Sequence, residues 1–284
     1  MSLWQRLVQI DRRIIYIILV IVTVVPMIRP LGLPIPISKD TRQFYDGMKA
    51  APDGSVVVID WEVRFGRPTW NMLLEDVFKH LLTKNVKIIN VSFDRSLEGG
   101  EVNEIVTRKI DPEKSFGKKY GIDYVNLGAV PGEIASLAGF VKDAWSVYPT
   151  DNRGTPVAQL PIMQYMKTGA DIDYVVCIGS GVQIWWIGQL QQTYGTPIYS
   201  LADAGEATAI RPFLQSGQVK ALLVDLQGAA EYEVLTGMPG EGLKGMDPMN
   251  TIHLTQAALL VFANIVFLMS RISKKEPAKE AVKA

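Results

Sequence analysis

The chain has 284 residues, and its 29 basic side chains equal its 29 acidic ones, so the formal net charge at neutral pH is zero. This balance gives no bulk attraction to nucleic acid, and we expect no nucleic-acid partner. The single cysteine, Cys177, excludes an internal disulfide, and the two histidines, His80 and His253, are too far apart to form a Cys/His zinc site. We therefore expect no metal and no cofactor.

The first notable feature is an uncharged apolar run at residues 14–28, which neighbouring apolar residues extend toward the ~20 needed to span a bilayer. The alternative is a cleavable signal peptide with Arg12 and Arg13 as its basic part. The run ends in prolines and an arginine without a small-x-small cleavage site. We therefore predict a transmembrane helix at residues 14–33 after a cytoplasmic tail, residues 1–13.

Residues 34–250 are expected to form one α/β domain, entered through a proline-rich linker. Short β-branched runs typical of buried strands lie at residues 56–60, 86–91, 124–127, 174–178, 197–200 and 221–224. Helical stretches follow them at residues 69–83, 102–109, 132–147, 182–193, 207–215 and 229–235. Nearly continuous apolar strands separated by helices predict a Rossmann-like parallel sheet of about six strands with helices on both faces. Glycines and prolines predict a loop at residues 238–250.

Candidate ligand-binding residues follow the strands, because ligands of open parallel sheets bind beyond the carboxyl ends of the strands. These residues are Asp60, Trp61, Asp94, Gly179, Ser180, Gly181, Asp203 and Asp225. The aspartates could hold Mg²⁺ or Ca²⁺, but aspartate also caps helices after strands, and we predict no metal site. The glycine turn could hold an anion at a helix start or simply be a tight turn. Ile184 replaces the third glycine of the dinucleotide fingerprint, which argues against an NAD site.

The loop at residues 148–161 is long and polar, and its tip residues Asp151, Asn152 and Arg153 are the predicted partner contact. No Gly-x-Ser-x-Gly elbow or histidine relay is present, so we name no catalytic residue and favour a non-enzymatic role. The neighbouring Trp185 and Trp186 would point to different faces of a helix.

A second apolar segment, residues 251–270, contains no Asp, Glu, Lys or Arg and has the length of a spanning helix. A buried core helix is the alternative, but the segment is apolar on every face and a basic tail, residues 271–284, follows it. Gln256 and Asn264 within it would gain from hydrogen bonds to another helix, or are simply tolerated polar residues. We predict a second transmembrane helix at residues 251–270.

Basic residues set the predicted orientation. The outer tails hold eight lysines and arginines, and the flanks on the domain side hold four within a comparable distance. Because positive flanks stay in the cytoplasm, we predict a two-pass protein of the cell or inner membrane with both termini cytoplasmic and an extracytoplasmic, periplasmic domain.

The strand-to-helix turns at residues 174–205 resemble those of periplasmic binding-protein and other Rossmann-like sensory domains, which implies ligand recognition at strand ends. Our first hypothesis is a membrane-anchored, non-catalytic scaffold in a homo-oligomer or an assembly with other membrane proteins. The second is an extracytoplasmic sensor of a small-molecule ligand, which would need a partner to relay its signal because the expected tails are short. The third is a divalent-metal-dependent hydrolase.

Overall fold

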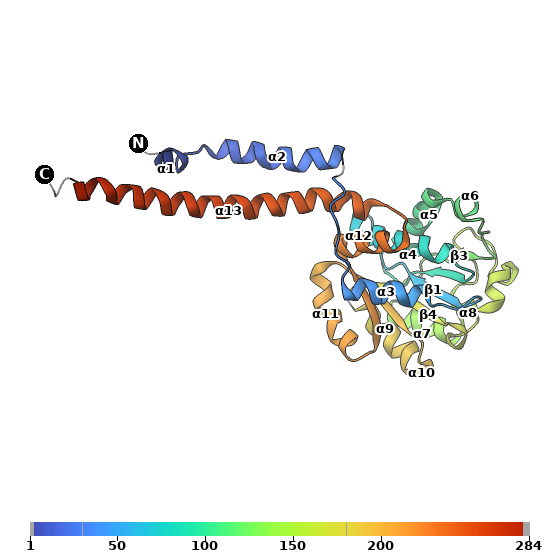
Figure 1. Ribbon diagram of the computed structural model, residues 1–284. Coiled ribbons are helices and arrows are strands. Elements are labelled where there is room, and N and C mark those ends of the chain that lie inside the picture. Colours follow the sequence, from blue (N-terminus) through green and yellow to red (C-terminus); the bar gives the residue numbers. More distant parts are fainter. Residues whose placement is uncertain (1–2, 30, 180, 281–284) are drawn as a thin grey trace. The chain divides into compact units, whose positions relative to one another are not determined.

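The computed structural model describes residues 3–29, 31–179 and 181–280 (Figure 1). The chain divides into two compact units. Ile35–Leu243 form an α/β domain, and Met1–Pro34 with Lys244–Ala284 form a helical unit.

The domain is built on a six-stranded parallel sheet with the order β3-β2-β1-β4-β5-β6. The strands are β1 (Val56–Asp60), β2 (Lys87–Val91), β3 (Tyr124–Asn126), β4 (Tyr174–Ile178), β5 (Ile198–Ala202) and β6 (Val219–Val224). The predicted parallel sheet is therefore confirmed. Chain order runs outward in opposite directions from β1 and β4, so the topological switch point of this Rossmann-like sheet lies between them.

Helices cover both faces of the sheet, as predicted (Figure 1). One face packs against α3 (Lys39–Lys49), α4 (Pro68–Leu82), α5 (Glu98–Ile110) and α12 (Asp225–Thr236). The other packs against α7 (Ile134–Lys142), α8 (Ala144–Val147), α9 (Val182–Trp186) and α11 (Ala204–Gln215). Shorter elements are α6 (Pro112–Phe116), a π turn (Ile187–Gln191), α10 (Gln192–Tyr194) and the 3₁₀ turns Val157–Gln159, Pro161–Tyr165 and Gly169–Asp171.

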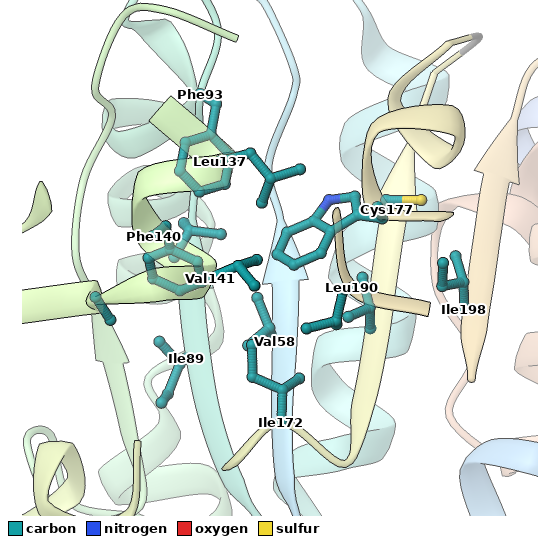
Figure 2. Packing of buried hydrophobic residues seen from close by; sticks show 14 of the residues in the cluster. Val58, Ile89, Phe93, Leu137, Phe140, Val141, Ile172, Cys177, Leu190 and Ile198 are labelled. Carbon is teal, nitrogen blue, oxygen red and sulfur yellow. The ribbon is translucent and has the colours of Figure 1, made fainter. Parts of the chain in front are cut away.

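Alternate residues of each strand serve opposite apolar layers, because side chains on a strand point to opposite faces in turn. In β1, Val56 and Val58 belong to the layer under α7 and α9, and Val57 and Ile59 belong to the layer under α4. Figure 2 shows the first layer, where side chains from several strands meet α7. Cys177 lies in this layer and is fully buried.

Two element predictions need correction. The helix expected at residues 132–147 is interrupted at Asp143, whose carboxylate accepts hydrogen bonds from the backbone of Trp145 and Ser146 and starts α8 there. The loop expected at residues 238–250 is wrong from residue 241 onward, because α13 (Glu241–Glu280) already begins there. One of its glycines, Gly242, is required for packing rather than for a turn, since a Cβ there would lie 2.6 Å from the Ala230 backbone nitrogen.

Both ends of the domain are held by α12. The backbone N–H and the hydroxyl of Ser38 donate to Glu231 at 2.9 and 2.5 Å, where the chain enters the domain. Glu233 accepts from the backbone N–H groups of Gly240, Gly242 and Leu243 at 2.7, 2.7 and 2.8 Å, where α13 begins. Both carboxylates are almost completely buried, so these are charge-assisted bonds away from solvent.

The helical unit contains α1 (Leu3–Leu7), α2 (Arg12–Ile28) and the rest of α13. The Thr251 hydroxyl donates to the backbone carbonyl of Val22 at 2.8 Å, which ties α13 to α2. Asp247 accepts from the backbone N–H groups of Gly32 and Leu33 at 2.8 and 3.1 Å. These bonds make the unit a helical hairpin.

Within the described residues, one helix is long and apolar enough to span a membrane, and it covers Glu241–Ile272. Only 6% of its apolar window is buried, so the alternative of a buried core helix is wrong. Helix α2 has 17 residues and falls just short of that length, although its apolar side chains are also largely exposed. Of the two predicted spans, the second thus coincides with a helix long and apolar enough to cross a membrane, and the first does not.

Candidate functional site

A cleft of about 260 Å³ opens at the carboxyl ends of the strands and includes the switch point between β1 and β4. Its lining comes from the loops or helices after five strands. The lining residues are Glu62, Arg64, Arg67, Trp70, Asp94, Glu133, Gly179, Val182, Trp185 and Glu206. We call this the switch-point cleft. It lies where ligands of open α/β sheets bind.

Two neighbouring carboxyl groups lie at the end of β1, Asp60 as its last residue and Glu62 two residues later. Each has an oxygen without a hydrogen-bond partner among the described residues. Asp60 is fully buried, and its Oδ2 accepts a hydrogen bond from the Trp186 indole at 2.8 Å. The other oxygen, Oδ1, and the Oε2 of Glu62 have no hydrogen-bond partner. Buried polar atoms are normally satisfied, so two unsatisfied oxygens beside a cleft mark a place where a ligand could supply donors.

Burial and mutual repulsion change the acidity of this pair. Burial raises the pKa of Asp60 to about 7, although the Trp186 hydrogen bond opposes the shift. Burial, and then the charges of Asp60 and Asp94, raise the pKa of Glu62 to about 9. Glu62 is therefore protonated at neutral pH, and a positive charge placed beside it would favour its ionised form.

The arginines of the cleft are already paired. The Arg64 Nε lies 3.3 Å from the Asp94 carboxylate, and the Arg67 guanidinium lies 3.2 Å from Asp203. Burial raises the pKa of Asp94, but hydrogen bonds from Ser96 and Arg64 outweigh it and leave that pKa below its usual value. Asp94 is thus ionised and matched by Arg64.

Two tryptophans give the cleft aromatic walls. Trp70, in the first turn of α4, is 8% exposed, and its indole N–H has no acceptor. The Arg67 guanidinium lies over its ring, 4.6 Å from the centroid. Gly179 lies against the same ring with a φ of +99°, and a Cβ there would be 3.1 Å from Trp70. Trp185, on α9, contributes another wall.

The predicted ligand residues are only partly brought together. Asp94 and Gly179 line the cleft, Asp60 lies beside Glu62, and Asp203 holds Arg67. Trp61 is fully buried instead, with its indole donating to Asn90 at 2.8 Å.

Three further predicted residues are placed as follows. Gly181 lies at the start of α9, where its N–H donates to Gln183 at 2.9 Å. Asp225 begins α12 with a φ of +56° and is not among the lining residues. Ser180 lies outside the described residues.

Sequence reasoning did not select several residues that line the cleft: Glu62, Arg64, Arg67, Trp70, Glu133, Val182, Trp185 and Glu206. Glu62 could have been found, because it follows the central strand by two positions. Trp185 also had a signal, since one of two adjacent tryptophans on a helix must face away from the other. Trp186 is buried against Asp60, and Trp185 faces the cleft.

The predicted partner loop is tied to the domain. The Asp151 carboxylate is 4% exposed and accepts from the backbone of Arg153 and Thr155 and from the Tyr120 hydroxyl. Arg153 stacks on the Tyr120 ring at 3.6 Å and bonds to Glu104. Asn152 is exposed, so a partner would meet mainly the outer side of this loop.

The two predicted helix-contact residues both lie on α13. The Asn264 amide donates to the Leu260 carbonyl one turn earlier at 2.8 Å, within its own helix. Gln256 is exposed on the same helix. A contact of either side chain with another helix stays a prediction.

Chemically, the switch-point cleft offers carboxyl groups, paired guanidinium groups, indole rings and a free indole donor. Within the described part of the chain, no three His, Cys, Asp or Glu side chains come close enough to hold a metal ion. The arrangement is therefore suited to holding an organic molecule by charge, hydrogen bonds and aromatic contact.

Comparison with known proteins gives little further information. The chain matches no protein-family model and no curated protein. Among solved structures it is similar to a trehalose-6-phosphate synthase, OtsA, with a TM-score of 0.33 and 9% identity. The match covers 84% of this chain and 48% of that one, so the chain spans about half the length of that structure. A similarity this low supports no inference about function.

Proposed function

We propose that this protein is a membrane-anchored binding protein whose α/β domain holds a small polar molecule in the switch-point cleft. The observation that supports this function is the cleft itself: about 260 Å³ beside the central strands, with unsatisfied oxygens on Asp60 and Glu62 and an unsatisfied indole N–H on Trp70. Glu62 and Trp70 both line this cleft, and a scaffold has no need of unsatisfied polar groups there. A bound molecule would satisfy them.

The proposal includes two membrane passes, with α2 as the first and α13 as the second. A helix of 17 residues measures about 26 Å, a few ångströms less than the hydrocarbon core, and Arg12 and Arg13 at its start can extend toward the headgroups. The bond from Thr251 to Val22 supports a paired hairpin. The excess of basic residues in the outer tails favours an extracytoplasmic domain.

A thermal-shift screen of the full chain in detergent with a mixed metabolite library tests the binding function. At a concentration 100 times its Kd, a ligand stabilises the folded state by about 2.7 kcal/mol, which corresponds to roughly 5–10 °C for a domain of this size. We expect at least one metabolite to give such a shift. Asp94→Asn and Trp185→Ala should reduce it, and the exposed control Glu113→Gln should not. If no compound of any charge class raises the melting temperature, the binding function is wrong.

Assembly with other copies or other membrane proteins is a second proposal. Between α2 and α13 the hairpin has an apolar hollow of about 390 Å³, which lipid or a neighbouring helix would fill; its lining includes Ile14, Ile18, Phe262 and Val266. Blue-native electrophoresis of the solubilised chain should then show species larger than a monomer. A monomer at every protein concentration would contradict homo-oligomerisation. The third hypothesis, a metal-dependent hydrolase, has no support from a group of metal ligands among the described residues.

A further inference from the structure

The charge balance of the switch-point cleft gives the first indication of its ligand. Four acids line it, Glu62, Asp94, Glu133 and Glu206, against two arginines. Both arginines are paired, with Asp94 and Asp203, and Glu133 is paired with Arg95 outside the lining at 2.7 Å. Among the described residues Glu62 forms no salt bridge, and Asp60 interacts with it electrostatically.

The second indication is independent of the acids and comes from Trp70. This side chain is more than nine-tenths buried, lines the cleft and has an indole N–H without an acceptor. The Arg67 guanidinium lies over the Trp70 ring, 4.6 Å from its centroid, so the aromatic surface for a ligand would come from Trp185, which also lines the cleft. Aromatic rings beside carboxylates are typical of sites for organic cations, because the ring face attracts positive charge. The Trp70 indole N–H could in addition donate to an acceptor oxygen on the ligand.

We propose that the cleft binds a small organic cation, a protonated amine or guanidinium compound with at least one acceptor atom, and that Glu62 receives its positive charge. This inference rests on the proposed binding function and narrows its ligand class. The Glu62 carboxyl, which lines the cleft, would accept from the cationic N–H groups, and the buried Asp60 would add negative potential close to it. Trp70 would donate to the ligand acceptor. The volume of about 260 Å³ suits a metabolite-sized molecule.

The ionisation of Glu62 provides a readout, the pH dependence of binding, that would not change if Glu62 had a purely structural role. Glu62 faces Asp60 from β1, Asp94 after β2 and Glu133 before α7, and the same cleft contains Arg64, Arg67 and Glu206. Because Glu62 is protonated at pH 7 and must lose that proton to pair with a cation, binding should release a proton. Apparent affinity should then increase about tenfold between pH 7 and 8.

The test uses matched probes that differ in charge and little in shape: arginine against citrulline, and agmatine and putrescine against 1,4-butanediol. Isothermal titration of the full chain in detergent, at pH 7 and 8 in buffers of different ionisation enthalpy, measures affinity and proton release. We expect at least one cationic probe to bind at least tenfold more tightly than its neutral counterpart. Glu62→Gln should weaken that binding at least tenfold, and Glu113→Gln should leave it unchanged.

Three outcomes would overturn the inference. They are equal binding of charged and neutral probes, unchanged binding by Glu62→Gln, and binding of none of the cationic probes. A metabolite screen in which only neutral or anionic compounds, or divalent metal ions, stabilise the chain would also refute it. That last result would leave the binding function standing, so the two proposals fail separately.

Discussion

The acidic residues in and beside the switch-point cleft differ from one another in the state of their protons. Asp60 and Glu62 have raised pKa values because burial penalises their charged forms, whereas Asp94 beside them has a lowered one because Ser96 and Arg64 donate to it. Groups whose environments separate their pKa values in this way are common at functional sites. The same shifts make the stability of the domain depend on pH.

Glu62→Gln should reveal this dependence. In the folded protein the pKa of Glu62 is about 9, against 4.5 for the ordinary value, so its stabilising contribution is complete below pH 4.5 and is lost as pH rises toward 9. Glutamine cannot ionise, and the variant should gain on the parent chain by up to about 1.4 kcal/mol per pH unit over that window. Urea unfolding of the two chains at pH 5, 7 and 9, followed by tryptophan fluorescence, measures the difference. A difference that stays constant with pH would contradict the raised pKa.

A comparison of the predicted helices and strands with the observed ones shows which parts of the structure follow from local sequence patterns. Each strand was predicted within two residues of its observed ends, because continuous β-branched runs such as residues 174–178 have few other solutions than a buried strand. Helix α3 was not predicted, since its apolar face, with Phe44 and Met48, is short in an otherwise polar stretch. The start of α13 was assigned to a loop because glycine and proline usually mark turns and loops. Here they lie within the helix.

The candidate site was less predictable than the sheet. Asp94 and Gly179 follow directly from strand ends, and so does Asp60. Trp70 and Arg67 do not, because their place in the cleft depends on the path of the chain between β1 and α4. The sequence also does not show whether an acidic side chain at a strand end has hydrogen-bond partners. Glu62 and Asp94 both follow strands, and only the structure shows that their partners differ.

Helix α12 is the element with the clearest mechanical role, because Glu231 holds the entrance of the domain and Glu233 holds its exit. Asp76 contacts Glu233 from α4. Burial and the Glu233 charge raise the pKa of Asp76 to about 9, so it remains a neutral partner at pH 7. Glu233 therefore stays available as the acceptor of the backbone N–H groups at the start of α13.

Matched glutamine variants separately test the hydrogen bonds of Glu231 at the domain entrance and those of Glu233 at its exit. Glu233→Gln removes the charge and one acceptor oxygen from three hydrogen bonds, and should destabilise the start of α13 by about 2 kcal/mol. Hydrogen–deuterium exchange should then rise at residues 240–243 and remain unchanged at residues 38–41. Glu231→Gln should show the reverse pattern. Equal effects of both variants on both segments would mean that α12 responds as a whole and that the two sets of hydrogen bonds are not separate.

The whole molecule combines a complete α/β domain with a helical hairpin, and these two units require different surroundings. The hairpin exposes large apolar side chains along both helices, among them Ile17, Val20, Leu260 and Leu268. Exposed apolar surface of this extent is typical of contact with lipid or with other proteins. The proposed two-pass arrangement places all of it in the bilayer.

Cysteine accessibility tests this topology. With Cys177 replaced by alanine, we introduce Gln9→Cys before α2 or Lys142→Cys on the exposed side of α7. A membrane-impermeant maleimide should label Lys142→Cys from outside intact spheroplasts, and Gln9→Cys only after the membrane is opened. The Cys177→Ala chain is the unlabelled control. Labelling of both positions from the same side would show that α2 does not cross.

The pairing of α2 with α13 has a thermodynamic consequence once this hairpin is in the bilayer. Residues 35 and 243 would then remain near each other even when the domain between them unfolds, so the membrane would act as a cross-link closing a loop of 209 residues (243 − 35 + 1). In the chain-entropy description of cross-links, closing a loop of this length removes freedom from the unfolded chain equivalent to about 5 kcal/mol. A domain without disulfides would thereby gain the kind of stabilisation that secreted proteins obtain from them. After each unfolding event, its two ends would still be in place for refolding.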